Sequence, residues 1–197
     1  MNSDIFNDES SAYIPNAAPV FESDLDIQRL LPPHSIEAEQ AVIGGLLLAN
    51  DRWDDVADLL TDTDFYRADH RHIFRAMQLL VDAEMPLDVV TLIDKLGNLE
   101  LLEKTGGLPY LAELALNTPS AANIRAYAVA VQEKSLSRQL LLAANHIEKI
   151  TRNPDGRAAA DIIAEAERQL IDIAEGRAKE GGPQDINPIL KASVEQI

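Results

Sequence analysis

The sequence predicts an all-α fold: a compact helical head, then an antiparallel αα-hairpin, then a tethered linker helix. Apolar residues recur at steps of three to five along most of the chain, which is the spacing that buries one side of a helix. No run of alternating β-branched residues indicates a strand. With 197 residues, 46% of them hydrophobic, the chain is long enough to bury a sizeable core.

The composition excludes several classes of function. The chain carries 33 Asp and Glu residues against 17 Lys and Arg, a formal net charge of −16. Such a surface repels phosphate backbones, so we expect no general DNA binding by this chain, and a basic protein partner fits it better. The absence of cysteine excludes disulfide scaffolds and thiol nucleophiles. No stretch approaches the ~20 apolar residues of a membrane span. We therefore expect a cytoplasmic protein.

The head is predicted over residues 31–117, after an acidic tail (1–30) that we expect to be disordered because it is polar and shows no sustained period. Ser35 is the predicted N-cap of the first helix. Gly44 and Gly45 lie inside that helix, where glycine is unfavourable, which indicates that another helix approaches closely. Further helix starts are predicted at Asp69, Asp88 and Pro109, and a stop at Gly97.

Residues 118–176 are predicted to form the hairpin. Residues 123–152 contain no Pro or Gly, the sequence Asn-Pro-Asp-Gly at 153–156 breaks the helix, and a second helix follows to about Glu175. Each helix carries apolar residues on more than one side, so another surface must cover some of them. The predicted self-association residues are Leu140, Ile147, Ile163 and Leu170. The alternative is that this stripe folds back on the head.

Residues 177–197 are predicted to be a flexible linker and the start of a linker helix. Gly181, Gly182 and Pro183 favour flexibility, and Asn187 with Pro188 can begin a helix. The predicted docking residues of this helix are Leu190, Val194 and Ile197. The helical pattern is still running at Ile197, so we expect the sequence to be part of a longer protein.

Catalytic, cofactor and metal sites are not predicted in this chain. No glycine pair is followed by the Lys-Ser/Thr of a phosphate-binding loop. His70 and His72 point about 200° apart on a helix, whereas a shared metal ion favours a spacing of four residues. One of these histidines is expected to pack or cap, and the other to face water. The few aromatic residues are interpreted as core, because acids surround them.

Several stretches, read in order, resemble the N-terminal domain of the DnaB family of bacterial replicative DNA helicases. Together they span residues 30–175, the whole folded part of the prediction. They are residues 31–48 (LPPHSIEAEQAVIGGLLL), 64–66 (DFY) with His70, Ile73 and Phe74, 86–88 (PLD) with 90–92 (VTL), Gly106 and Gly107 with Tyr110 and Leu111, and 119–124 (PSAANI) with Tyr127 and Ala128.

The resemblance implies a helical head, a hairpin and a linker helix that precede a RecA-like ATPase domain, which this sequence lacks. It implies a homohexamer, in which hairpins pair two subunits and heads close a trimer of dimers. It also implies that this collar binds the C-terminal domain of primase in the primosome, that a helicase loader is a further partner, and that the linker helix docks on a neighbouring motor domain. ATP, magnesium and DNA belong to the missing motor domain, so this chain alone is not expected to hydrolyse ATP.

Two other hypotheses remain at this point. A stand-alone adaptor, such as a helicase loader or an anti-termination scaffold, could use the same head. A small enzyme could use some of the many carboxylates. A gene that continues into a phosphate-binding loop would favour the helicase module, whereas a stop codon near residue 197 would favour the adaptor.

Overall fold

A computed structural model describes residues 31–118 and 120–180 of the chain, and its residues from 33 onward belong to one compact unit. These described ranges contain helices and no strand, which confirms the predicted all-α fold. The predicted acidic tail over 1–30 and the docking residues Leu190, Val194 and Ile197 lie outside the described residues.

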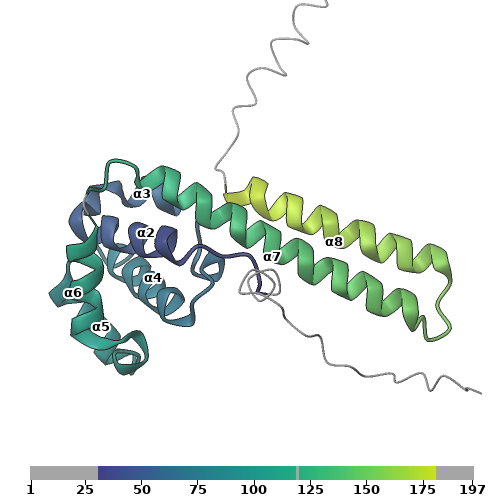
Figure 1. The fold of residues 1–197 in the computed structure, drawn as a ribbon, viewed down its shortest axis with the longest axis horizontal. Helices are drawn as coiled ribbons and strands as arrows, with labels where there is room; N and C mark the ends of the chain where they lie inside the picture. Colours follow the sequence, from purple (N-terminus) through teal and green to yellow (C-terminus); the bar gives the residue numbers. More distant parts are fainter. Residues whose placement is uncertain (1–30, 119, 181–197) are drawn as a thin grey trace, which may run out of the picture. The chain divides into compact units, whose positions relative to one another are not determined.

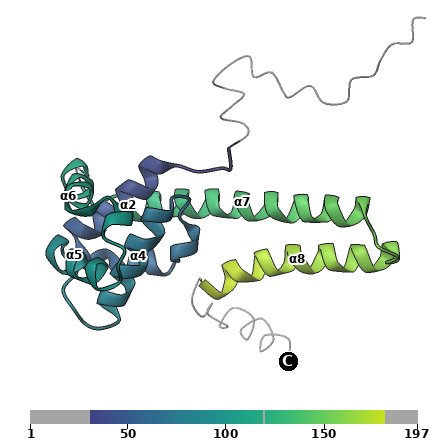
Figure 2. The same ribbon diagram turned by 90° about the horizontal axis from the view of Figure 1, so that it is seen from below.

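Five helices form the head, and two longer helices follow. The head helices are α2 (Ile36–Leu48), α3 (Trp53–Ala57), α4 (Ala68–Val81), α5 (Val89–Asn98) and α6 (Gly107–Asn117), with the 3₁₀ helices η1 (Asn50–Arg52), η2 (Asp62–Asp64) and η3 (Glu103–Thr105) between them. The long helices are α7 (Ile124–Arg152) and α8 (Ala159–Glu180). The head helices pack around the first half of α7, and α8 runs beside its second half (Figures 1 and 2).

The first helix, α2, is the centre of the head and contacts both α6 and α7. It begins where predicted, because the Ser35 hydroxyl accepts a hydrogen bond from the Ala38 N–H at 3.2 Å. A Cβ atom on Gly44 would overlap with Thr118 Oγ1 and the Leu114 carbonyl oxygen, and one on Gly45 would lie 2.9 Å from Ile124 Cδ1. The prediction that this glycine pair permits a close helix approach is therefore confirmed.

The core of the head combines residues of α2 to α6 with the first turns of α7. Each of these helices contributes at least one apolar side chain with no measurable exposure, and these side chains pack together into one core. They include Val42, Ile43, Leu46, Ile73, Met77, Leu80, Leu92, Leu96, Leu111, Ile124 and Ala128. Trp53, Phe65 and Phe74 are buried too, as the core interpretation of the aromatic residues predicts.

The structure confirms the predicted helix start at Asp88 and not the one at Asp69. Asp88 caps α5 as predicted, accepting from the N–H groups of Val90 at 2.8 Å and Thr91 at 2.9 Å. The prediction for Asp69 was wrong, since α4 already begins at Ala68, with Arg67 at the N-cap position. Asp69 instead lies inside the first turn of α4, where its carboxylate accepts hydrogen bonds from the Arg67 side chain and from the His70 N–H.

The predicted stop at Gly97 and start at Pro109 are each displaced. Helix α5 runs through Gly97 to Asn98, and the left-handed residue that ends it is Glu100, with φ 57°. Helix α6 begins at Gly107, so Pro109 is its third residue. Proline is tolerated there because N–H groups of the first turn have no partner within the helix. The second hairpin helix also continues past Glu175, to Glu180.

Candidate interaction site: the helical hairpin and the polar network of the head

The second half of α7 and the whole of α8 form the predicted antiparallel hairpin (Figure 2). Glu165 of α8 joins the two helices, because its carboxylate lies 2.9 Å from His146 Nε2 on α7 and 2.9 Å from Arg157 Nη1 in the connection. The hydrogen bond from His146, with the positive charge of Arg157, lowers the pKa of Glu165 below its ordinary value. The hairpin is therefore held partly by ionic contacts near its surface.

The four predicted self-association residues all lie on this hairpin and outside the core of the head. Leu140 is 49% exposed, Ile163 58% and Leu170 47%. Ile147 is half-buried. The hairpin therefore displays apolar side chains that neither of its helices covers.

On α7, the two predicted residues follow one line along the helix. Ala143 and Ile150 are buried, and α8 is the helix that packs on this half of α7, so we take their side of α7 as the side covered by α8. Leu140 and Ile147 each lie three residues before one of them in the sequence. A step of three residues turns the helix by about 300°, so both side chains are rotated by about 60° from the covered side, in the same direction.

The same relation holds on α8. Ala166 and Ile173 are half-buried, and Ile163 and Leu170 again lie three residues before them. Because the two helices are antiparallel, an equal rotation in the same sense brings both pairs to one common face of the hairpin. We call Leu140, Ile147, Ile163 and Leu170 the hairpin face.

Three further exposed apolar residues of the hairpin were not predicted: Leu141, Leu142 and Ile171. A signal for two of them exists in the sequence. Three consecutive leucines (140–142) span about 200° of a helix, so they cannot all face one neighbouring helix. Leu142 is accordingly 70% exposed.

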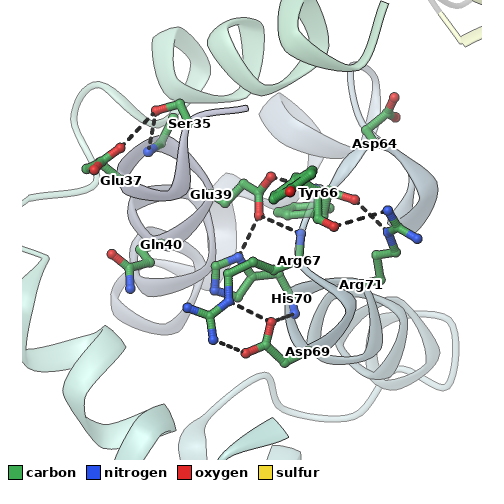
Figure 3. Close-up of polar contacts among 12 residues, drawn as sticks. Ser35, Glu37, Glu39, Gln40, Asp64, Tyr66, Arg67, Asp69, His70 and Arg71 are labelled. Carbon is green, nitrogen blue, oxygen red and sulfur yellow. Dashed lines mark hydrogen bonds and ion pairs between the residues drawn. The ribbon is translucent and has the colours of Figure 1, made fainter. Parts of the chain in front are cut away.

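The head contains a buried polar network centred on Glu39 of α2, which is 1% exposed (Figure 3). Its carboxylate accepts from the Tyr66 N–H at 2.6 Å and from the Arg67 N–H at 3.3 Å, two residues that directly precede α4. His70 Nδ1 lies 2.7 Å from the same carboxylate. One carboxylate thus binds two backbone N–H groups just before α4 and a side chain in its first turn.

His70 extends this network to α6. Its Nε2 atom lies 2.7 Å from the hydroxyl of Tyr110, which also accepts from Gln40 Nε2 at 3.3 Å. A neutral imidazole with its proton on Nδ1 satisfies both contacts. The expectation that one histidine of the pair packs is met by His70, which has no measurable exposure, whereas His72 is half-buried. The network fixes α2, α4 and α6 to one another.

Arg138 attaches α7 to the head at the point where the hairpin begins. Its Nη1 donates to the Pro33 carbonyl at 2.8 Å, and its Nη2 donates to the Asp64 carbonyl. The guanidinium also lies over the Tyr66 ring, 5.8 Å from the centroid. Burial lowers the pKa of Arg138, and the nearby charge of Glu39 opposes that effect. These contacts set the rotation of α7 relative to the head.

The titratable groups of the network bind one another rather than lining an open cleft. Within residues 31–118 and 120–180, no group of three or more His, Asp and Glu side chains could hold a metal ion. None of the helices in these ranges is long and apolar enough to cross a membrane.

A family model for the DnaB-like helicase N-terminal domain matches residues 31–133, more than half of the chain. The chain belongs to this DnaB-like family. The matched region contains the whole head, including Glu39, Gly44, His70 and Tyr110. The resemblance seen in the sequence thus rests largely on residues that build the head.

Curated relatives agree with this assignment. The chain is 42% identical over 168 residues to the replicative DNA helicase DnaB of Haemophilus influenzae, covering 85% of this chain and 36% of that protein. It is 38% identical over 169 residues to the replicative DNA helicase DnaC of Bacillus subtilis, again covering 85% and 36%. The chain therefore spans about a third of the length of these DnaB-type relatives.

Solved structures agree as well. The N-terminal domain of DnaB helicase from Mycobacterium tuberculosis is 35% identical and superposes with a TM-score of 0.69, covering 72% of this chain and all of that one. A DnaB-like replicative helicase, described with its interactions with primase, is 26% identical with a TM-score of 0.62, covering 83% of this chain and 36% of that one. The fold of the head and hairpin is thus a known DnaB fold.

Proposed function

We propose that this chain is the N-terminal collar and docking domain of a hexameric bacterial replicative DNA helicase. In this role it supports assembly of the hexamer and binds the C-terminal domain of primase during DNA replication. The observation that carries the proposal is the hairpin face, an apolar surface on a helix pair that is fixed to the head and left uncovered. The family assignment says which kind of protein would use it.

A second copy of the chain is the proposed occupant of the hairpin face. Burial of apolar surface contributes about 25 cal/mol per Å², and contiguous exposed apolar patches are typical of association surfaces. When two copies are related by a two-fold axis, the same surface of each copy lies at the interface. The hairpin face of one copy would then pack against the hairpin face of the other. The resulting dimers would combine through their heads into a trimer of dimers.

The proposal includes two further protein partners. Primase is named with one of the solved DnaB-like helicases, and a helicase loader is the further protein partner we propose. ATP, magnesium and DNA would be bound by a motor domain that is not part of this sequence, and the linker residues Leu190, Val194 and Ile197 would dock on it. The net charge of −16 supports a division in which DNA contacts lie outside this chain. The proposed location is the bacterial cytoplasm.

Light scattering of the 197-residue chain at micromolar concentration tests self-association. We expect a dimer or a larger species, and a monomer for the double variant Leu140→Asp with Leu170→Asp. Val90→Asp is the matched control, because Val90 is an exposed apolar residue of the head and not of the hairpin. A wild-type chain that stays monomeric would overturn the proposal, as would dissociation caused equally by the control.

Two ligand titrations test the division of labour. The C-terminal domain of the primase from the same organism should bind the assembled chain. Millimolar ATP should leave the melting temperature unchanged, because only a ligand that binds the folded state raises it. A clear upward shift with ATP, or micromolar binding of single-stranded DNA at physiological salt, would contradict the proposal.

A further inference from the structure

A groove lies on the head where η1 and the start of α3 meet the connection between α4 and α5, with a volume of about 350 Å³. Its size is at the lower end of the range for ligand pockets, roughly 300–1,000 Å³. It is separate from the hairpin and from the Glu39 network, since no residue of either lines it.

The floor of the groove is apolar and preformed. Trp53, Val81, Met85 and Pro86 contribute to it, and Met85 is 45% exposed. The loop that carries Met85 is held by its backbone, because the Met85 N–H donates to the Leu80 carbonyl at 2.9 Å. An exposed methionine side chain adapts to apolar groups of different shapes. The floor could therefore take one apolar side chain without rearrangement of the backbone.

The rim of the groove is acidic. Asp51, Asp54 and Glu84 line it, and none of the three forms a side-chain hydrogen bond or an ion pair with any residue in the described part of the chain. The neighbouring Arg52 does not neutralise them, because its Nη1 pairs with Asp55 at 2.9 Å. No Lys or Arg lines the groove among the residues that the structure describes. Three carboxylates thus surround an apolar floor.

We propose that this groove binds a short basic segment of a partner protein. The segment places an apolar side chain on the floor beside Met85 and directs flanking Lys or Arg side chains to the acidic rim. Complementary charge of this kind selects partners and speeds their encounter, while the apolar anchor supplies most of the affinity. The three carboxylates of the rim also argue against a nucleic acid as the occupant, because its phosphates would be repelled there.

Trp53 allows a direct test, because it is the only tryptophan of the chain and lines the groove. The probe is the synthetic peptide acetyl-Lys-Lys-Leu-Leu-Lys-Lys-amide, titrated into the 197-residue chain. We expect a saturable change in tryptophan fluorescence, and shifts of the Met85 and Leu87 amides in two-dimensional NMR. The NMR readout detects binding even if the indole environment stays constant. No saturable response in either readout would overturn the proposal.

Two control peptides separate the floor from the rim. Replacing the leucines by serine removes the apolar anchor, and replacing the lysines by glutamate reverses the charge. We expect no saturable binding of either peptide. Equal binding of the acidic peptide would show that charge does not select the ligand, and equal binding of the serine peptide would show that the floor plays no part; either result overturns the proposal.

Matched variants separate this groove from the general acidity of the surface. Asp54→Asn with Glu84→Asn removes two rim charges, and asparagine tolerates the left-handed backbone of Glu84, with φ 53°. We expect about fivefold weaker binding of the basic peptide, in line with the loss of two exposed ion pairs. Glu167→Gln with Asp172→Asn removes the same charge from α8 and should change nothing. An equal loss in both double variants would overturn the assignment to this groove.

Discussion

The head and the hairpin use the same apolar residue types in opposite ways. In the head, α2, α4 and α6 enclose one another, and side chains such as Leu46 and Phe74 are fully covered. In the hairpin, two helices can cover only one line of each other, and Leu140 and Leu170 stay about half exposed. The head encloses a core of apolar side chains and leaves only single ones such as Val90 and Met85 exposed at its surface, whereas the hairpin leaves apolar side chains uncovered along one face.

A single helix shows both regimes. Val131, in the first half of α7, is 1% exposed and belongs to the core of the head, while Leu142, eleven residues later, is 70% exposed. The polar groups differ in the same way. The Glu39 network is buried and internally satisfied, whereas the Glu165 contacts of the hairpin lie near the surface.

The largest expected effect on this comparison comes from Glu39→Ala. It leaves the N–H groups of Tyr66 and Arg67 and the His70 ring without their acceptor inside the head. We expect the free energy of unfolding to fall by about 3–5 kcal/mol, measured by urea unfolding followed by circular dichroism. Glu37→Ala, on the exposed side of the same helix, should stay within about 0.5 kcal/mol. A loss below 1 kcal/mol for Glu39→Ala would mean that the network does not hold the head.

Alanine at two helical glycines should change stability in opposite directions. Gly44→Ala forces the new methyl group against the Leu114 carbonyl and Thr118, so we expect a loss of about 1–3 kcal/mol. Gly97→Ala meets no atom within 4 Å and should stabilise α5 by up to about 1 kcal/mol. Thermal melts of both variants check this pair, and a gain at Gly44 would refute the close approach.

A smaller effect is expected in amide hydrogen exchange. Within the described residues, α7 is the one helix against which α8 packs extensively. The amides of α8 should therefore exchange faster than those of α2 at low protein concentration. Protection of α8 should increase with protein concentration, because the proposed self-association would cover the hairpin face. The Leu140→Asp with Leu170→Asp variant should lose that concentration dependence. If α8 were already as protected as α2 in this variant, the contrast between head and hairpin would be wrong.

The smallest expected effect is on the acid stability of the hairpin. The pKa of Glu165 is lowered in the folded state, so the unfolded chain binds a proton more readily. Its contribution is therefore present above the ordinary glutamate pKa and is lost as pH falls through the lower, folded-state pKa. Exchange of α8 amides between pH 6 and 3 should show this loss in the wild type and not in Glu165→Gln. Glu167→Gln, exposed on the same helix, should behave as the wild type does.

Local signals predicted the helices well, because a cap or a break acts within a few residues. Ser35 and Asp88 were identified as caps, and the Asn-Pro-Asp-Gly break placed the hairpin connection. The failures at Asp69 and Gly97 also have a local cause. Asp69 has a cationic neighbour, Arg67, that draws its carboxylate into the first turn, and Glu100 supplies the left-handed residue that Gly97 was expected to supply.

Contacts across long sequence separations were beyond prediction. Glu39 lies three residues after Ile36 and four before Ile43, on the apolar side of the first helix. That position indicates burial, yet it cannot name the partners, which are 27 to 31 residues away. The hairpin residues could be chosen by periodicity, and their exposure is visible in the structure; whether a second copy covers them stays a prediction.

Helix α7 runs without interruption from the head into the hairpin. The number of residues between its two parts therefore determines the direction in which the hairpin face points relative to the head. Arg138 and the core residues near Ile124 fix one part of the helix against the head. One residue inserted just beyond Arg138 would turn the hairpin face by about 100° about the axis and advance it by about 1.5 Å, while both helices remained intact. Seven inserted residues would return the face to within about 20° of its original direction. Changes of length in this segment should therefore be tolerated in steps of seven and not in steps of one.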